Sequence, residues 1–508
     1  MKDHIRKFLP CVLLSILTGL FTGGLIFLFK IASGEVMHLA AKGYAFVREN
    51  PIWLPVLILA VAVLGLLASL ILKHAKECRG GGIPTAVVSI RGLAPMKWLQ
   101  GIFGVFASSL LSYLGGVPLG NEGPSVQMGA AVGKGTVSIF GKRTRAWERY
   151  VMSGGACAGF AAATGAPLTG ILFAVEEAHR RFSPMIFMVA AISVFTGMAT
   201  QQALEALFCV ESHGFFFGEL PVLPMKMLWI AAAVGAACGL CAMAFAKLYQ
   251  VFKGSKWLKK LPFTVKIVMI FIFAAILGFC CEDFIGSGAS LVEKILSGGS
   301  VWYWLLAALA VRGLMLILSN TQGVTGGAFI PTLAFGAILA ALVAKVCGAE
   351  GEYFGIFVAV GMAAFLAALS RTPIMALLFA AEALCGIGNI LPVGVGVAVA
   401  YLLVEVSGIT AFTDSVIESK AEAAREDKKL VVVDEFMTVR PGSFACGREV
   451  RDILWPPACT VLSVRREGQP AQFPEAPLQA GDVLHLYYRT WDEKESREAL
   501  EDILGVSS

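Results

Sequence analysis

One carboxylate stands among glycines between two long apolar runs of this chain. The stretch covers residues 120–125 and reads Gly-Asn-Glu-Gly-Pro-Ser, with Glu122 as its acid. Gly120 and Gly123 allow backbone angles that other residues resist, and Pro124 suits the first turn of a helix. The stretch therefore predicts a break in the backbone followed by the N-terminus of a helix.

This break would hold Glu122 where an anion binds. Broken backbone survives inside a membrane only where protein or a water-filled path satisfies its polar groups, and the N-terminus of a helix attracts anions. An ionised Glu122 would compete with an anion for this position, and a protonated Glu122 would leave it. The predicted chemistry is a proton-sensitive gate on an anion path; the alternative is a surface loop in which Glu122 caps its own helix.

The composition predicts a protein that crosses a membrane many times. Of the 508 residues, 57% are hydrophobic and 15% are charged, and the mean hydropathy is +0.75. A span needs about 20 apolar residues, and many hydrophobic stretches of the chain are long enough, while others are short and interrupted by glycine or proline. The net charge of +5 is modest and the basic residues lie in loops, so no nucleic-acid partner is predicted.

Neither an enzyme nor a metal site is predicted. The six histidines form no HExxH pattern and no Ser-His-Asp arrangement, and the sequence has no nucleotide-binding loop. The twelve cysteines are scattered, mostly through apolar runs, which indicates core residues rather than a disulfide framework. Cys238 and Cys241 form a CxxC pair inside the apolar run 228–246, where core packing is the favoured interpretation.

The elements around Glu122 form a first set of apolar segments. Lys2, Arg6 and Lys7 precede a first span at residues 8–29, interpreted as a signal anchor with a cytoplasmic N-terminus. A second glycine break at residues 80–84 precedes a segment too short to span, which predicts a helix that enters the membrane only partway. The other helices of this half are expected near residues 52–72, 96–116, 125–140, 148–163, 167–181 and 184–207.

The second half of the chain looks like a repeat of the first. Residues 165–176 parallel residues 371–382 at an offset of 206 (373 − 167), which also relates Gly120 to Gly326 (326 − 120). Paired broken helices at matching positions are the best sequence pointer to a transporter's binding site. The repeats are placed at about residues 8–207 and 221–415, and their relative direction stays open. Helices of the second half are expected near residues 223–252, 264–280, 288–297, 302–319, 329–346, 353–370, 373–386 and 390–407.

The chain becomes polar after Thr413 and Asp414. Residues 421–429 are expected to form a charged linker, and residues 430–508 have the composition of a soluble domain. About 80 residues suffice for a small α+β domain. The predicted strands are residues 430–433, 460–464 and 483–488, and the predicted helix is residues 492–504.

Residues 1–420 resemble the CLC family of chloride channels and proton-coupled chloride exchangers. Three motifs carry the resemblance, in the family's order: Gly-Gly-Gly-Ile-Pro at 80–84, Gly-Asn-Glu-Gly-Pro at 120–124 and Gly-Ala-Phe-Ile-Pro at 327–331. The resemblance implies an all-α polytopic membrane fold with two inverted repeats and with broken and re-entrant helices. It also implies a homodimer with one pore in each subunit, and it implies no cofactor.

The resemblance assigns residues to anion binding and proton transfer. Glu122 would be the gating and proton-coupling glutamate, and Glu177 the inner proton-transfer glutamate. For Glu177 the alternative is an ordinary helix-end acid beside Arg180 and Arg181. The implied anion-binding residues are Gly81, Gly82, Ile83, Pro84, Asn121, Gly123, Ala328, Phe329, Ile330 and Thr413.

Three positions depart from the family's pattern. Gly81 replaces a serine whose hydroxyl usually donates to the central anion, and Thr413 stands where the family has a tyrosine, with a hydroxyl on a shorter arm. A net hydrogen bond to a charged group is worth roughly 1.5–3 kcal/mol, so both changes predict a weaker central site. Asn121 removes a positive charge beside the gate and resembles the family's fluoride-exporting branch.

These residues lead to one expected function and two alternatives. The expected function is exchange of chloride, or a similar halide, for protons, with Glu122 as the gate. The alternatives are an uncoupled, voltage- or pH-gated chloride channel, motivated by Gly81 and Thr413, and a fluoride/proton antiporter, motivated by Asn121. The protein would lie in the cell membrane with its N-terminus and its C-terminal domain in the cytoplasm.

The tail, residues 430–507, resembles the C-terminal regulatory domain of potassium-transport regulators. Gly481 and Asp482 are its most recognisable residues, within the run Leu-Gln-Ala-Gly-Asp-Val-Leu at 478–484. The resemblance implies a domain that dimerises and can bind a small ligand. The alternative is a dimerising appendage without a ligand.

Overall fold

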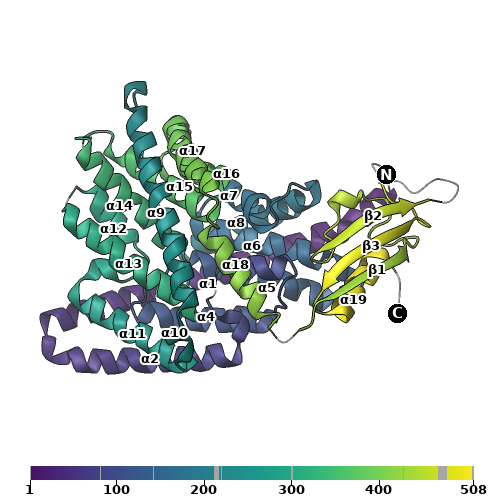
Figure 1. Cartoon of the computed structure of the whole chain (residues 1–508), viewed down its shortest axis with the longest axis horizontal. Coiled ribbons are helices and arrows are strands. Elements are labelled where there is room, and N and C mark those ends of the chain that lie inside the picture. Colours follow the sequence, from purple (N-terminus) through teal and green to yellow (C-terminus); the bar gives the residue numbers. More distant parts are fainter. Residues whose placement is uncertain are drawn as a thin grey trace.

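The computed structural model describes residues 2–80, 82–140, 142–210, 217–218, 220–298, 301–349, 351–426, 428–466 and 477–505. Most of this part of the chain is helical, and a small sheet domain lies against one end of the helix bundle (Figure 1). We call that end of the bundle the proximal end and the opposite end the distal end. The expected fold class, an all-α membrane protein with a small α+β domain, is confirmed.

The first helix is much longer than the sequence predicted. Among the described residues, eight helices are long and apolar enough to cross a membrane. The first of them, α1 (Lys2–Glu49), continues past the end expected near Phe29 because residues 30–49 contain no proline and several good helix formers. Its 48 residues extend for about 72 Å at about 1.5 Å per residue. Since the hydrocarbon core is about 30 Å thick, α1 must lie obliquely or project beyond it.

The first repeat contains the expected short and broken helices. α5 starts at Glu122 rather than near residue 125, and the helix after Pro167 ends in a π-helical turn, η4, at Ala178 rather than at Arg181. The eight-residue helix α3 rises only about 12 Å and cannot cross a membrane. The elements after α1 are η1 (Pro51–Trp53), α2 (Leu54–His74), η2 (Lys76–Cys78), α3 (Ile83–Ile90), α4 (Trp98–Leu114), α5 (Glu122–Phe140), η3 (Lys142–Trp147), α6 (Glu148–Thr164), α7 (Pro167–Phe173), η4 (Ala174–Ala178) and α8 (Pro184–Phe208).

The second repeat has the same succession of elements. α7 and α16 begin 206 residues apart (373 − 167), as do α8 and α17 (390 − 184). A further helix, α18 (Phe412–Ala423), follows the repeat and includes the first residues of the expected linker. The elements are η5 (Met225–Met227), α9 (Leu228–Gly254), α10 (Lys256–Lys260), α11 (Phe263–Cys280), η6 (Glu282–Phe284), α12 (Ala289–Leu296), α13 (Trp302–Gln322), α14 (Phe329–Val346), α15 (Phe354–Ser370), α16 (Pro373–Phe379), η7 (Ala380–Leu384), η8 (Ile387–Asn389) and α17 (Ile390–Ser407).

A reciprocal contact joins the two repeats. Glu382 of η7 accepts hydrogen bonds from the backbone amides of Leu168 and Thr169, both at 2.8 Å. Glu176 of η4 accepts the equivalent pair from residues 374 and 375, at 3.0 and 2.6 Å. Donors and acceptors are all displaced by 206 residues (374 − 168, 382 − 176). The two halves therefore meet about a local two-fold axis, as in an isologous dimer interface.

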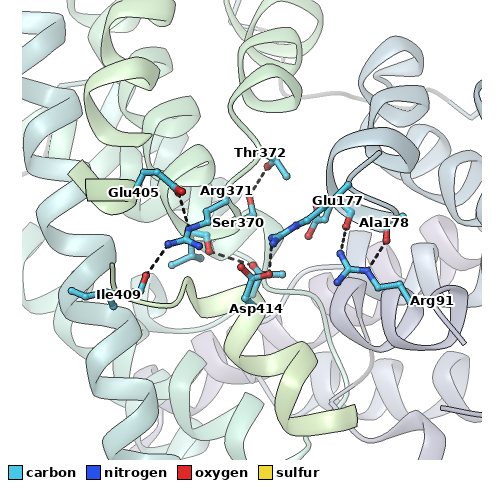
Figure 2. A network of polar contacts seen from close by, with 12 residues as sticks. Arg91, Glu177, Ala178, Ser370, Arg371, Thr372, Glu405, Ile409 and Asp414 are labelled. Carbon is cyan, nitrogen blue, oxygen red and sulfur yellow. Dashed lines mark hydrogen bonds and ion pairs between the residues drawn. The ribbon is translucent and has the colours of Figure 1, made fainter. Parts of the chain in front are cut away.

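The two repeats run in opposite directions. α6 begins at the proximal end, where Tyr150 in its first turn donates a hydrogen bond to Asp452 of the sheet domain (2.7 Å). The equivalent helix α15 ends there instead. Arg371, directly after α15, belongs to a polar cluster (Figure 2), and next to that cluster Arg181 donates to Ile453 of the sheet domain (3.0 Å). One helix of the equivalent pair thus starts at the proximal end, where the other helix ends, as expected for inverted repeats.

The sheet domain contains three antiparallel strands in the order β1-β3-β2 and a C-terminal helix. Leu484, Leu486 and Tyr488 of the central strand alternate toward the core, where Leu500 and Ile503 of the helix cover them. β1 continues past the expected end at residue 433, because β3 pairs with it along its whole length. The polar residues after 433 do not end the strand, since outward-facing positions of a strand can be polar. The elements are β1 (Val431–Thr438), η9 (Val450–Asp452), β2 (Cys459–Arg465), β3 (Val483–Thr490) and α19 (Glu493–Leu504).

A buried guanidinium fastens the sheet domain to the bundle. Arg149 of α6 donates to the carbonyls of Leu454 (3.2 Å) and Trp455 (2.7 Å) in the sheet domain. It also donates to Ile90 (2.8 Å), the last residue of α3, and to Arg91 (3.1 Å). The end of the partway helix is therefore held directly against the sheet domain.

Candidate functional site

The three glycine motifs meet at one point of the bundle. A Cβ atom added to Gly123 would lie 2.7 Å from the Cα atom of Gly327 and 2.9 Å from that of Gly82. Real Cβ atoms do not come this close to backbone atoms. The three segments can therefore approach one another this closely only because glycine has no side chain. Breaks that lie between 41 (123 − 82) and 245 (327 − 82) residues apart in the sequence are thus assembled into one site.

Two of the breaks are paired through their backbones. The amide of Gly120 donates to the carbonyl of Gly327 (2.8 Å), and the amide of Gly327 donates to that of Gly120 (2.7 Å). This pairing brings the start of α5, at Glu122, beside the start of α14, at Phe329. Two helix N-termini, whose first amides have no carbonyl partner within their own helix, then lie close together, an arrangement that favours an anion between them.

The side chain that faces this position is Glu122. It is 3% exposed, and its carboxylate folds back over Gly120, whose added Cβ would lie 2.6 Å from Oε2. The backbone amides of Glu122 itself and of Ile330 approach the carboxylate. Among the described residues Oε2 has no hydrogen-bond partner. The carboxylate thus stands where the two helix ends would receive an anion, and one of its oxygens is held only weakly.

Two residues that the sequence analysis missed support this geometry. The Tyr113 hydroxyl donates to the carbonyl of Gly120 (2.6 Å), which fixes the backbone in front of Glu122. Gln127 of α5 accepts from the amide of Gly82 (3.0 Å) and donates to the carbonyl of Glu77 (3.0 Å). A buried glutamine five residues after Glu122 in an apolar helix was the available signal, but the sequence gave no partner for it.

The other expected anion-binding residues lie around the same junction. Gly82 caps α3, so Ile83 and Pro84 form its first turn, and Ala328 caps α14, whose first turn contains Phe329 and Ile330. The Asn121 carbonyl accepts the Ser125 hydroxyl (2.8 Å), one turn into α5. Gly81 lies outside the described residues. The described residues of the three motifs therefore lie together, and each break directly precedes a helix.

Thr413 uses its hydroxyl elsewhere. Its Oγ1 donates to the carbonyl of Leu369 in the last turn of α15 (3.4 Å).

Two turns later on the same face of α18, Lys420 donates from Nζ to the carbonyl of Arg79 (2.7 Å), directly before the first glycine break. The sequence analysis missed this lysine, which brings a positive charge beside Gly80, where the added Cβ would lie 3.1 Å from Nζ.

Glu177 lies apart from the glycine junction, in the proximal polar cluster of Figure 2. It is 4% exposed and sits in η4. Arg91 donates to the backbone carbonyls of Glu177 (2.9 Å) and Ala178 (2.7 Å), and Arg180 pairs with Asp414 (2.6 Å). The Glu177 carboxylate is therefore buried in the field of these two arginines, Asp414 and the adjacent Glu176.

The chain matches known proteins over most of its length. The family model "Voltage gated chloride channel" matches residues 64–405. The structure is similar to that of a slow cyanobacterial Cl⁻/H⁺ antiporter, with a TM-score of 0.74, 23% identity, and coverage of 81% of this chain and 98% of that chain.

Two further solved structures have the same fold. One is a CLC-type fluoride/proton antiporter, with a TM-score of 0.66, 19% identity, and coverage of 80% of this chain and 98% of that chain. The other is a eukaryotic CLC transporter, with a TM-score of 0.64, 18% identity, and coverage of 81% and 74%. With the family model matched over two thirds of its residues, this chain belongs to the CLC family of voltage-gated chloride channels and transporters.

Proposed function

We propose that this protein exchanges chloride, or a similar halide, for protons across the cell membrane, with Glu122 as the gate. The observation that carries the proposal is the Glu122 carboxylate, which is buried between the starts of α5 and α14 with Oε2 unpartnered among the described residues. A carboxylate in an anion's position can be displaced by the anion or by a proton. Either event opens the site, which links the two fluxes.

The proposed path uses the two buried acids in turn. Protonated Glu122 swings away and leaves the amides around Gly123, Phe329 and Ile330 to the anion. Glu177, in the proximal cluster, receives or releases the proton on the other side. Burial and nearby charges set when an acid takes up a proton, and the charges around Glu177 are those of Arg91, Arg180, Asp414 and Glu176.

We place the proximal end in the cytoplasm. The basic residues Lys2 and Arg6 lie at the N-terminal end of α1, and positive residues favour the cytoplasmic side. Phe8 at the start of α1 lies against Arg448 of the sheet domain, with 5.8 Å from the guanidinium carbon to the ring centroid. The N-terminus and the sheet domain therefore share one side.

We further propose a homodimer with one pore in each subunit and a regulatory sheet domain of the potassium-regulator type, with room for a small ligand.

A fluoride/proton antiporter is the second candidate. Asn121 favours it, because a cation is missing beside the gate, and the fold is shared with a CLC-type fluoride/proton antiporter. An uncoupled channel, gated by voltage or pH, is the third. It is favoured by the Thr413 hydroxyl, which donates to the carbonyl of Leu369 in α15.

The test uses the full-length protein in liposomes. Proton uptake would be recorded under a chloride gradient and then a fluoride gradient, for the native protein, Glu122→Gln and the control Glu35→Gln, whose side chain is exposed on α1. We expect chloride to drive proton uptake, and Glu122→Gln to abolish it while the control retains it. Uptake driven by fluoride alone would select the second candidate. Anion flux without proton movement in the native protein would select the channel.

A further inference from the structure

A lysine inside the bundle lies near the gate on a different helix. Lys30 of α1 is partly buried, and its Nζ lies 3.5 Å from the carbonyl oxygen of Ala162, in the last turn of α6. The preceding residue, Phe29, packs against Tyr113, with ring centroids 6.4 Å apart. Tyr113 is the residue that holds Gly120, so this part of α1 lies beside the element in front of the gate.

The packing of α5 against α6 puts Ala162 level with Glu122. Added Cβ atoms on Gly133, Gly129 and Gly159 would lie 2.5, 2.1 and 2.2 Å from the carbonyl oxygens of Val151, Gly155 and Ser125. Each step of four residues back along α5 is thus matched by four residues forward along α6. Three further residues lead from Ser125 to Glu122 on α5 and from Gly159 to Ala162 on α6. The ammonium of Lys30 therefore lies at the depth of the gate.

The gate has few other charged neighbours. Lys30 attracts both Glu122 and Glu205 of α8. In the described part of the chain, Tyr113 of α4 is a further titratable neighbour of Glu122, and α14 contributes the Ile330 amide. Within the described chain, α3 and α6 beyond Arg149 carry no charged residue, and the next charge along α5 is Lys134, more than three turns away.

We propose that Lys30 supplies, from α1, the positive charge that position 121 lacks, holding the ionised form of Glu122 and attracting anions to the distal entrance. This inference rests on the proposed role of Glu122 as the gate. Asn121 leaves the gate stretch without a cation, while Lys30 offers one at the same depth through tertiary packing. The two acids that share it, Glu122 and Glu205, would connect the gate with the distal surface.

Lys30 could instead serve only to cap α6. An ammonium satisfies a C-terminal carbonyl of a helix whether or not a gate lies nearby. Lys30→Gln separates the two roles, since the amide can still donate to Ala162 but carries no charge. Lys30→Arg keeps the charge and the donor. Asn121→Lys adds a cation at the residue before Glu122 and leaves Lys30 unchanged.

The experiment measures the pH dependence of chloride-driven proton uptake in liposomes. Without the cation, the ionised carboxylate is less stable, so Glu122 stays protonated to higher pH. We expect Lys30→Gln to move the profile upward by about one pH unit, the lower end of the effect of a nearby opposite charge. Lys30→Arg should resemble the native protein, and Lys30→Gln with Asn121→Lys should return toward it. Asn121→Lys alone should move the profile downward.

Two controls separate this inference from the proposed function. Lys42→Gln removes an exposed lysine of the same helix and should leave the profile unchanged. An unchanged profile in Lys30→Gln, or equal shifts in Lys30→Gln and Lys30→Arg, would refute the electrostatic role and leave a structural one. The role would also be refuted if Asn121→Lys failed to reverse the shift. Retention of proton uptake in Glu122→Gln would instead overturn the gate itself, whatever Lys30 does.

Discussion

The two repeats share a backbone but differ in their acids. Glu176 and Glu382 occupy equivalent positions, and each accepts hydrogen bonds from two amides of the other repeat. Glu382 accepts one more, from the Thr169 hydroxyl (2.6 Å), where the other repeat has Met375. Glu122, by contrast, has Phe329 as its structural counterpart at the start of α14, and Glu177 has Ala383 (383 − 177 = 206). The acids that obey the symmetry each accept two backbone amides of the other repeat. The acids that break it are almost fully buried, and among the described residues one carboxylate oxygen of Glu122 has no hydrogen-bond partner.

The same asymmetry occurs among the backbone-strained positions. Arg180 (φ 53°) corresponds to Gly386 (φ 70°), and Arg371 (φ 57°) corresponds to Gly165 (φ 74°). A left-handed conformation is free for glycine but costs an L-residue roughly 1–2 kcal/mol. Because the repeats are inverted, both arginines lie at the proximal end and both glycines at the distal end. In this conformation Arg180 pairs with Asp414 and Arg371 pairs with Glu405. Asp414, Arg371 and Glu405 are labelled in the polar cluster of Figure 2.

This comparison teaches where function resides in a duplicated fold. The symmetric features, such as the paired glycine breaks and the acids between the repeats, hold the two repeats together. The chemistry lies where one repeat carries a group that the other lacks. Substitution of an asymmetric acid should therefore impair proton transport, whereas substitution of a symmetric acid should mainly lower stability.

The largest effect is expected at an asymmetric acid, Glu177. Glu177→Gln keeps the shape but removes a proton carrier at the proximal side, so proton uptake should fall at least about tenfold while chloride flux continues. Liposome assays of both fluxes would measure the two separately. The neighbouring symmetric acid gives the matched control, because Glu176→Gln should keep the ratio of protons to chloride. Equal loss of coupling in both variants would contradict the division between the acids.

An intermediate effect is expected at the symmetric pair. Glu176→Gln and Glu382→Gln each weaken two hydrogen bonds from backbone amides to a carboxylate, and a bond to a charged group contributes roughly 1.5–3 kcal/mol. Each variant should lose about 2 kcal/mol of stability through the equivalent amide contacts, and the loss in Glu382→Gln should be somewhat larger because Glu382 also accepts from the Thr169 hydroxyl. Thermal unfolding in detergent micelles would measure them. A large loss in one variant alone would break the symmetry argument.

The smallest effect is expected at a well-satisfied acid of the sheet domain. Arg466 pairs with Asp482 (2.7 Å) and holds the pKa of that carboxyl below its usual range, while the Gln479 amide also donates to it (2.7 Å). A lowered pKa gives stability that is present above about pH 4 and is lost as the pH falls through the folded-state value. Asp482→Asn should cost about 1–2 kcal/mol at pH 7.

The same variant should also lose part of its acid sensitivity. Tryptophan fluorescence, which includes Trp455 and Trp491 of the sheet domain, would follow thermal unfolding of the full chain between pH 7 and pH 3. The native protein should lose more stability over this range than Asp482→Asn. Parallel pH curves for the two proteins would show that Asp482 has no such role.

Local patterns were enough to predict much of this architecture. Glycine, proline and apolar spacing identified α3, α5 and α14 as broken or partway helices, because backbone freedom and helix starts depend on the residue itself. The offset of 206 revealed the repeat before its contacts were known. The end of α1 was wrong, since nothing local stops a helix that lacks proline after residue 29.

The sequence by itself determined which segments break, which halves repeat and which acid sits at a helix start, since these depend on residue type and spacing. Only the tertiary structure decided what faces that acid. Lys30 lies 92 residues before Glu122 (122 − 30), and Lys420 lies 341 residues from the carbonyl that it contacts. A charge acts through space, and spacing along the chain carries no information about which distant helix will bring it there.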